Sequence, residues 1–366
     1  MKTLATLFTG GGGFEAGAVQ AGFTPIWGVE CDPDIAQVYA RNFGPHVIVS
    51  TVEEVDYSTL QTPYHLHASP SCKKASIANK ERGESIEDIN AAEGTARAIR
   101  TLLPPNFSLE NVWGYREFES FKVILRALKE SGYAFDFWHL NSADFGVPQT
   151  RKRLILIASR THKPRRPQRT HAEHPSAQIG MFSSPLLKSN GWYKAIEDLI
   201  PTLPESKFAA WQLKRLPIER VGAFLATVGG EDSDYLTEGQ PSPVISAAHG
   251  AAKYRAFIVE GTAAGEDNKF NLPVRESQSP IFTVRGSNPR SPSRLQWLIA
   301  PPARGSHGGR VVSMTPRALA RFQSIPDSFV LPEKNGLACR VIGNAVPSLL
   351  GQRIIESVEA AEELAA

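Results

Sequence analysis

The feature that most constrains this chain is a run of four glycines placed directly after a short apolar segment. Residues 4–8 have the length and apolar character of a buried strand, and residues 10–13 are all glycine. Residues 14–21 then show helical spacing, with Gly22 as a stop. Glycines at such a place let a ligand approach the backbone where a helix begins. The pattern predicts a strand, a tight turn and a helix of the nucleotide-binding α/β type.

A carboxylate closes the next predicted strand. Residues 24–29 are expected to form that strand, and Glu30 follows it, twenty positions after Gly10. In nucleotide-binding α/β proteins an acid at this point receives ribose hydroxyls. Residues 11–16 also fit the loose dinucleotide pattern, which alone is a weak signal for any nucleotide.

Strands and helices alternate through the first 160 residues. Further strands are expected at residues 46–49, 64–68, 106–109, 135–140 and 153–158, and helices at 33–42, 85–103 and 118–129. This alternation predicts an α/β fold with one doubly wound, mostly parallel sheet, whose ligands bind at the carboxyl ends of the strands.

A single thiol follows the predicted strand at 64–68. Cys72 lies in a loop with Pro70 before it and Lys73 and Lys74 after it. The thiolate is the nucleophilic form, and neighbouring positive charge lowers the pKa of a thiol from about 8.5. The alternative is a loop cysteine beside a solvated lysine pair. Because Gly10, Glu30, Cys72 and Glu110 all follow or end predicted strands, they are expected along one rim, which favours the reactive thiol.

Composition limits the remaining possibilities. With 366 residues the chain is long enough for two domains, and its formal net charge of +3 means that any nucleic-acid surface is local. Three scattered cysteines are too few for a disulfide framework or a zinc site, which indicates a reduced, intracellular setting and no metal. Neither a signal peptide nor a membrane span is indicated, so no membrane partner is expected.

Five segments carry a resemblance to a known family. They are residues 8–14, the Pro-x-Cys loop with Ser76, Glu110-Asn111-Val112, residues 149–153 and residues 343–347. In order and spacing they resemble the DNA (cytosine-5) methyltransferases, of the bacterial restriction-modification type, over nearly the whole chain. The resemblance implies an S-adenosylmethionine-dependent methyltransferase fold and an enzyme that flips a cytosine out of double-stranded DNA and methylates its C5 carbon.

The resemblance also implies roles for individual residues. Cys72 would add to C6 of cytosine, Glu110 would hydrogen-bond ring N3, and Arg153, with Arg151 near it, would hold the cytosine carbonyl. The cofactor-binding residues implied are Phe8, Gly10, Gly12, Gly13, Phe14, Glu30, Cys31, Val52 and Asn344. Two departures stand out: Ser71 and Lys73 replace the usual proline and glutamine around the cysteine, and Thr51-Val52 stands where an adenine-contacting acid is common.

The second half of the chain has a different composition. Residues 160–169 carry five cations, no acid and two prolines, and are expected to form an extended linker. Residues 241–246 and 278–283 resemble each other at an offset of 37, and each precedes an apolar strand, at 256–259 and 295–299. This predicts a small β-rich domain, and the resemblance implies that this domain recognises the target DNA sequence. The cations expected to face DNA are Lys253, Arg255, Arg285, Arg290 and Arg294.

The predicted organisation is a catalytic and cofactor-binding domain of residues 1–163 and 338–366 with a recognition domain of residues 164–337. A helix at 347–363 is expected to pack beside the first strand. We expect a monomer in a prokaryotic cytoplasm, associated with the nucleoid, with a cognate restriction endonuclease as a possible partner. Two alternatives remain open: an RNA cytosine-5 methyltransferase, although no Cys-Phe-Thr sequence is present, and a non-catalytic DNA-binding relative.

Overall fold

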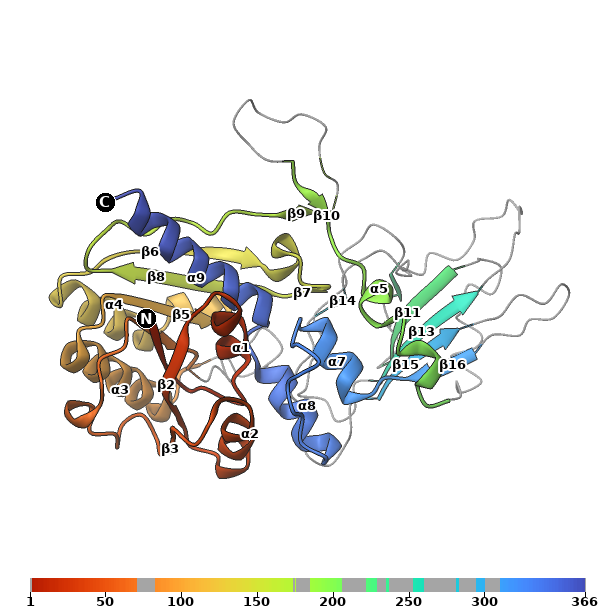
Figure 1. Cartoon of the computed structure of the whole chain (residues 1–366), viewed down its shortest axis with the longest axis horizontal. Coiled ribbons are helices and arrows are strands. Elements are labelled where there is room, and N and C mark those ends of the chain that lie inside the picture. The colour runs from red at the N-terminus through yellow and green to blue at the C-terminus, as the bar shows by residue number, and fades with distance from the viewer. Residues whose placement is uncertain are drawn as a thin grey trace, which may run out of the picture.

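The computed structural model describes residues 2–70, 83–173, 175, 185–205 and 312–365 with their side chains (Figure 1). It describes the backbone alone at residues 222–228, 235–236, 253–259, 281–282, 294–299 and 310–311.

A seven-stranded sheet forms the centre of the first half. Its strands are β1 (Thr3–Leu7), β2 (Thr24–Glu30), β3 (Val47–Val49), β4 (His65–Ala68), β5 (Asn106–Asn111), β6 (Ala134–Asn141) and β8 (Lys152–Ser159), in the order β3-β2-β1-β4-β5-β8-β6. All the pairs from β3 to β5 are parallel, and β8 is antiparallel to both β5 and β6. The predicted mostly parallel sheet is confirmed. Although β8 comes last in sequence, it lies inside the sheet, between β5 and β6.

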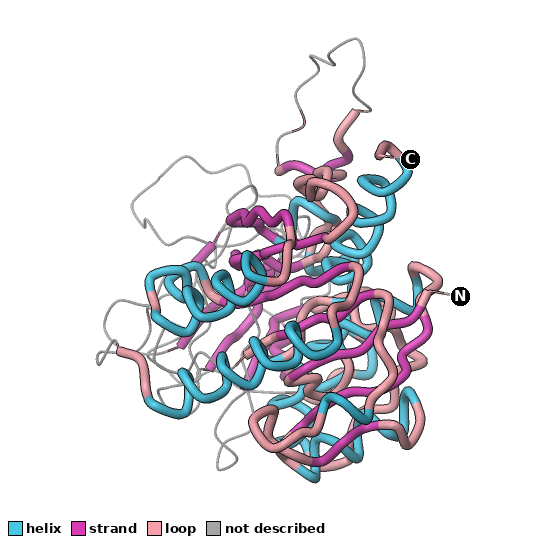
Figure 2. Tube along the Cα trace, turned by 90° about the vertical axis from the view of Figure 1, so that its left-hand side faces the viewer, coloured by secondary structure: helices cyan, strands magenta, loops and turns pink. Residues whose placement is uncertain are grey.

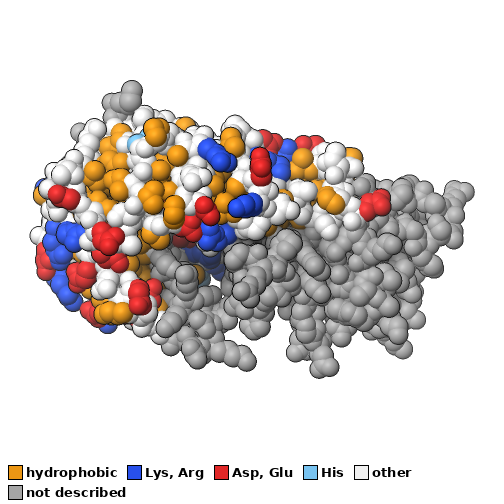
Figure 3. All heavy atoms as spheres, turned by 90° about the horizontal axis from the view of Figure 1, so that it is seen from below, with side chains coloured by type: hydrophobic (Ala, Val, Ile, Leu, Met, Phe, Trp, Pro, Cys, Tyr) orange, Lys and Arg blue, Asp and Glu red, His pale blue; other side chains and the backbone are white. Residues whose placement is uncertain are grey.

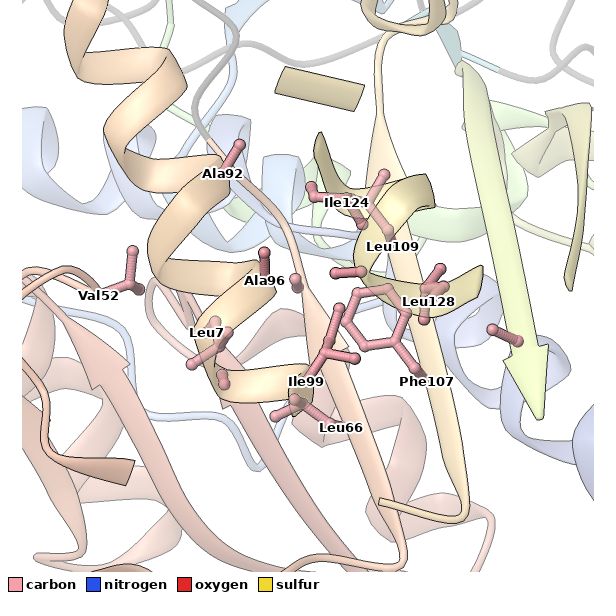
Figure 4. Close-up of a cluster of buried hydrophobic side chains, with 14 of the residues drawn as sticks. Leu7, Val52, Leu66, Ala92, Ala96, Ile99, Phe107, Leu109, Ile124 and Leu128 are labelled. Atoms are coloured by element: carbon pink, nitrogen blue, oxygen red, sulfur yellow. The ribbon is translucent and has the colours of Figure 1, made fainter. Parts of the chain in front are cut away.

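Helices cover both faces of this sheet, as Figure 2 shows. They are α1 (Gly13–Gln20), α2 (Pro33–Phe43), α3 (Ile86–Leu102), α4 (Glu119–Glu130) and α9 (Ser348–Glu363), with 3-10 turns at Tyr57–Thr59, Trp113–Glu117, Ser142–Phe145 and Ile200–Thr202. Successive residues of a strand point to opposite faces. Accordingly Leu4 packs with α1 and α9, whereas Leu7 packs with α3 and α4 (Figure 4). The predicted packing of the last helix beside the first strand is confirmed.

Side-chain caps fix where several helices begin. Asp32 accepts hydrogen bonds from the backbone of Asp34 and Ile35 at the start of α2, and Ser85 forms a capping box with Asp88 at the start of α3. The first turn of α4 is capped from elsewhere in the chain, because the Glu84 carboxylate accepts from the backbone N–H groups of Glu119 and Ser120 at 3.0 and 2.7 Å.

Residues 160–169 contain neither helix nor strand, as expected, but they do not leave the sheet directly. His162 is buried and contacts Ser159, and the Arg160 backbone N–H donates to the Pro105 carbonyl. Arg169 forms an ion pair with Asp144 at 3.2 Å. The segment therefore runs back along the seven-stranded sheet before it reaches β9 (Figure 1).

The second half contains a smaller sheet, in the order β12-β11-β13-β15-β16. The elements outside the main sheet are β7 (Gln149–Thr150), β9 (His171–Ala172), β10 (Leu187–Lys188), α5 (Trp192–Ile196), β11 (Gly222–Val228), β12 (Tyr235–Leu236), β13 (Lys253–Val259), β14 (Ile281–Phe282), β15 (Arg294–Ile299), β16 (Arg310–Ser313), α7 (Pro316–Phe322) and α8 (Asn335–Asn344). The two predicted apolar strands are confirmed as β13 and β15, which pair in parallel. Residues 241–246 lie outside the described residues, and β14 pairs with β7 rather than with this sheet.

Surface charge, helix length and the distribution of potential metal ligands indicate which kinds of partner the described residues could bind. On the face seen in Figure 3, positively and negatively charged side chains are interspersed over the described residues. That part of the surface does not offer a continuous positive field to a nucleic acid. Among the described residues, no helix has both the length and the apolar character needed to cross a bilayer, and no group of three or more potential metal ligands occurs.

Candidate active site

The glycine turn after β1 is packed on one side and open on the other. A Cβ at Gly12, whose φ is +96°, would lie 2.1 Å from the Phe43 ring, and one at Gly13 would lie 2.7 Å from Ala345. At Gly10, whose φ is +57°, a Cβ would meet nothing within 4 Å. Glycine is therefore required behind the turn for packing, while Gly10 presents an open backbone surface.

Glu30, at the carboxyl end of β2, is joined directly to this turn. Its Oε2 accepts the Gly10 backbone N–H at 3.0 Å, and its Oε1 accepts the Asp32 backbone N–H at 2.9 Å. The carboxylate thus ties the glycine turn to the start of α2 and is partly exposed next to the open side of Gly10.

The carboxyl end of β5 carries an ion pair. Glu110 and Arg153 are separated by 2.9 Å between Oε1 and Nε, and the two side chains are only 8% and 12% exposed. Because β8 is antiparallel to β5, its first residues lie where β5 ends, and Leu154 faces Asn111 in the register. The inserted strand therefore delivers Arg153 to Glu110.

Asn111 connects this pair to the cysteine loop. Its side-chain amide donates to the Pro70 carbonyl at 3.1 Å, and its Oδ1 accepts the Val112 backbone N–H at 2.8 Å. The Ser69 backbone N–H also donates to the Leu7 carbonyl. Cys72, the predicted nucleophile, lies outside the described residues, but the strand end that leads to it is fixed on both sides.

Arg151 has surroundings that the sequence did not indicate. It is 4% exposed, and its guanidinium donates to the Gly343 carbonyl at 3.1 Å, while its backbone N–H donates to the Asn141 side chain. Gly343 precedes Asn344, an exposed residue at the end of α8. The structure therefore brings Arg151 to the predicted cofactor-side asparagine rather than presenting it beside Arg153 as an open cation.

The side chain of Phe14 lies in the interior, so a contact of this residue with the cofactor would have to come from its backbone. It is 3% exposed, and its ring stacks on His67 with 3.5 Å between ring centroids. His67 belongs to a buried hydrogen-bonded chain that runs from Ser69 through His67 and Ser108 to His65, with distances of 2.8, 2.7 and 2.8 Å. Burial lowers the pKa of His65 to about 3 and that of His67 well below its usual value, so both rings are neutral. The sequence signal that could have revealed this buried chain is the pair of histidines at alternate positions of β4.

Phe8, Cys31 and Val52, which are also predicted to bind the cofactor, differ in how far they are exposed. Phe8 is half-buried and has a positive φ of 57°. Cys31 is exposed, and its Sγ contacts Glu30 Oε1 at 3.6 Å; burial and the Glu30 charge raise the pKa of this thiol. Val52 is 2% exposed and packs against Gly94. Its side chain therefore belongs to the core rather than to an open site.

The sheet order and the glycine turn define a class of fold that solved structures share. The methyltransferase EhMeth of Entamoeba histolytica is 13% identical and superposes with a TM-score of 0.60 over 100% of this chain and 99% of its own. The Dnmt2 methyltransferase of S. pombe is 14% identical, with a TM-score of 0.56 and 99% coverage of both chains. At these identities the likeness establishes the methyltransferase fold.

The family follows from the sequence comparison. The model of the C-5 cytosine-specific DNA methylases matches residues 2–360, and the chain belongs to this family. The Type II methyltransferase M.FnuDI of Fusobacterium nucleatum is 31% identical over 385 residues, covering 99% of this chain and 96% of its own. M1.HphI of Haemophilus parahaemolyticus is 25% identical, covering 97% and 86%. The protein is a DNA (cytosine-5) methyltransferase, as the sequence predicted.

Proposed function

We propose that the protein methylates C5 of a cytosine within a specific double-stranded DNA sequence, using S-adenosylmethionine, base flipping and a covalent bond between Cys72 and C6. The observation that carries the proposal is the buried Glu110–Arg153 pair at the end of β5, joined through Asn111 to the loop that leads to Cys72. These two groups match one edge of a cytosine, because the Glu110 carboxyl can donate to ring N3 when it carries a proton and the Arg153 guanidinium can donate to the carbonyl oxygen.

The residues present fit the proposed cofactor. Gly10 presents its backbone to open space, and Glu30 holds a carboxylate beside it for ribose hydroxyls. Asn344 lies exposed at the end of α8, where Arg151 fixes the preceding carbonyl. When bound, S-adenosylmethionine supplies an electrophilic methyl group.

The protein residues would then manage the reactivity of the base. Cytosine C5 is a weak nucleophile, so addition of the Cys72 thiolate to C6 is needed to place electron density on C5. In its protonated form Glu110 donates a hydrogen bond to N3 and so stabilises the negative charge that develops on the ring during this addition, while Arg153 orients Glu110 and donates to the carbonyl oxygen. After methyl transfer the C5 proton leaves to solvent and the bond between sulfur and C6 breaks, which restores both the aromatic ring and the thiolate. Flipping the base beforehand costs a few kcal/mol.

Residues 164–337 are proposed to select the DNA sequence, with Arg285, Arg290 and Arg294 among the cations that contact it. A phosphate contact would weaken binding to all sequences equally, whereas a base contact would relax specificity at one position by about 1–3 kcal/mol. Relatives over nearly the full chain carry Type II methyltransferase names, which supports a cognate restriction endonuclease as partner.

A mechanism-based trap tests the proposal. Expression in an unmethylated host, followed by sequencing of chemically converted genomic DNA, identifies the target sequence. A duplex with 5-fluorocytosine at that target should then form a covalent complex with the wild-type protein, because fluorine cannot leave C5 as a proton does. Cys72→Ala and Cys72→Ser should both abolish the complex, since a hydroxyl lacks the low pKa of a thiol.

Cys339→Ala is the matched control, because Cys339 is a buried thiol packed in a hydrophobic cluster, and this variant should still be trapped. Wild-type protein that binds duplex and cofactor but forms no complex on its target would favour a non-catalytic DNA-binding protein.

A further inference from the structure

A buried carboxylate lies directly under the glycine turn, and the chemistry proposed above does not use it. Glu15, in the first turn of α1, is fully buried. Its Oε1 accepts hydrogen bonds from the hydroxyls of Thr6, on β1, and Thr9, within the turn. Its Oε2 is also buried and has no hydrogen-bond partner among the described atoms. The acid is therefore built into the floor of the turn rather than its surface.

No lysine, arginine or histidine of the described part of the chain forms an ion pair with this acid. Its only polar contacts among the described residues are the two threonine hydroxyls and its own helix backbone. Burial raises the pKa of Glu15 to about 7, although the hydroxyls act in the opposite direction. A buried carboxylate without a counter-ion gains strongly when a positive charge arrives nearby.

We propose that Glu15 is a specificity-determining residue that makes the protein prefer the cationic sulfonium cofactor over the uncharged thioether product. This inference rests on the proposed function. S-adenosylmethionine carries one positive charge more than S-adenosylhomocysteine, and methyl transfer removes that charge. Thr9, whose hydroxyl donates to Glu15, directly precedes Gly10, so a cofactor bound at the open side of Gly10 would be separated from Glu15 by the turn alone. The carboxylate then attracts the cofactor and loses that attraction once the methyl group has been transferred.

The expected gain in cofactor affinity can be estimated from the separation of the two charges. If the turn and its side chains keep the Glu15 carboxylate about 10 Å from the sulfonium, their attraction at an effective dielectric of about 20 changes the dissociation constant of the cofactor by roughly tenfold. Because the interaction requires an ionised Glu15, the preference should be small at pH 5.5 and complete at pH 8.5.

Other titratable groups face the same region. Tyr39 of α2 approaches Glu15, and burial followed by the Glu15 charge raises the pKa of its phenol; His46 contacts that phenol, and burial lowers the pKa of the His46 ring. Glu30 lies on the cofactor side of the turn, and His67 lies behind Phe14. These four groups, and the amino group of the ligand, are present both in the wild type and in a variant changed only at Glu15. Their contributions to the pH dependence of binding therefore cancel when the two proteins are compared.

Calorimetric titration of wild-type protein and Glu15→Gln with both ligands, from pH 5.5 to 8.5, tests the inference. In the wild type, the ratio of the thioether to the sulfonium dissociation constant should rise by roughly tenfold over this range. In Glu15→Gln, which keeps the size and an acceptor oxygen, the rise should be absent and the ratio should stay near the wild-type value at low pH.

Proton release provides a second measurement that needs no variant. Near pH 7, wild-type protein should release more of a proton on binding the sulfonium than the thioether, as seen by calorimetry in buffers of different ionisation enthalpy. Equal pH profiles in both proteins, or equal proton release for both ligands, would overturn the role of Glu15 while leaving cofactor binding intact. Absence of binding of either ligand at any pH would instead contradict the proposed function.

Discussion

The two halves of the sheet rim are built by different means. At the ends of β1 and β2 the site consists of backbone: an open glycine and a carboxylate that accepts backbone N–H groups. At the end of β5 it consists of a buried side-chain pair, contributed by strands of opposite direction. Under the proposed function, the backbone half would bind the cofactor, which is the same in every reaction cycle. The charged side-chain pair would bind the target base, whose ring changes its electron density during the reaction.

The comparison also shows how each half depends on the rest of the fold. The glycine turn and Glu30 lie within one strand–helix–strand unit, so local sequence is enough to assemble them. Glu110 and Arg153 meet only because β8 is inserted between β5 and β6. A disturbance of the strand order should therefore damage the base side more than the cofactor side.

The largest effect is expected at Arg153. Arg153→Met leaves the Glu110 carboxylate buried without its partner and should lower the free energy of unfolding by about 3–5 kcal/mol. The double variant Glu110→Gln with Arg153→Met removes both charges and should recover most of that loss, while methylation stays absent. Urea unfolding and a methyl-transfer assay measure the two quantities. Unchanged stability in the single variant would mean that the pair is solvated.

On the cofactor side, Glu30→Ala should weaken S-adenosylmethionine binding by about 1.5–3 kcal/mol, because a charged hydrogen-bond acceptor is lost. Glu30→Gln keeps one acceptor oxygen and should lose less. Neither change should alter the affinity for duplex DNA. Calorimetry that gives equal cofactor affinity for the alanine variant and the wild type would remove Glu30 from the cofactor site.

Acid should act through the buried histidines, which lie between the two halves. The folded pKa of His65 is about 3, below the value of about 6.5 for an unfolded chain, so its contribution to stability is present above pH 6.5 and is lost as pH falls. Between pH 6.5 and 5, wild type should lose about 1.6 kcal/mol more than His65→Asn, and the slope approaches about 1.4 kcal/mol per pH unit near pH 5.

This comparison isolates His65. The raised pKa of Glu15 has the opposite sign, since a carboxyl that holds its proton in the folded state stabilises the fold as pH falls, but Glu15 is present in both proteins. Parallel curves of unfolding free energy against pH for the two proteins would show that His65 is not the group responsible.

The smallest effect is expected at Glu84, which caps α4 on the base side. Glu84→Gln should lower the free energy of unfolding by about 1 kcal/mol, because the charge at the first turn of α4 is lost. Glu93→Gln is the matched control, since Glu93 is an exposed residue of α3, and it should have almost no effect. A loss equal to that of the control would assign no stabilising role to the cap.

How far the sequence could predict this molecule differs between its parts. The glycine turn, Glu30 and the strands that carry them could be read from periodicity and turn residues, because their interactions are local. The position of β8 could not, since hydrophobic runs do not encode strand order or direction. Glu15 and the paired histidines were also missed, because burial of a polar side chain depends on the partners that the fold provides, here Thr6, Thr9 and Ser108.

The position of α9 has a consequence for the order in which this protein can fold during synthesis. Lys2 and Glu359 form an ion pair of 2.8 Å although they are 357 positions apart, and Gly17 of α1 lies directly against the backbone of Ser348. On the ribosome β1 and α1 emerge before residues 164–337, whereas the helix that covers them, α9, is made after those residues. The apolar face that includes Leu4 and Phe14 therefore stays uncovered until α9 has been synthesised. A chaperone that covers this face during that interval would protect the chain from aggregation.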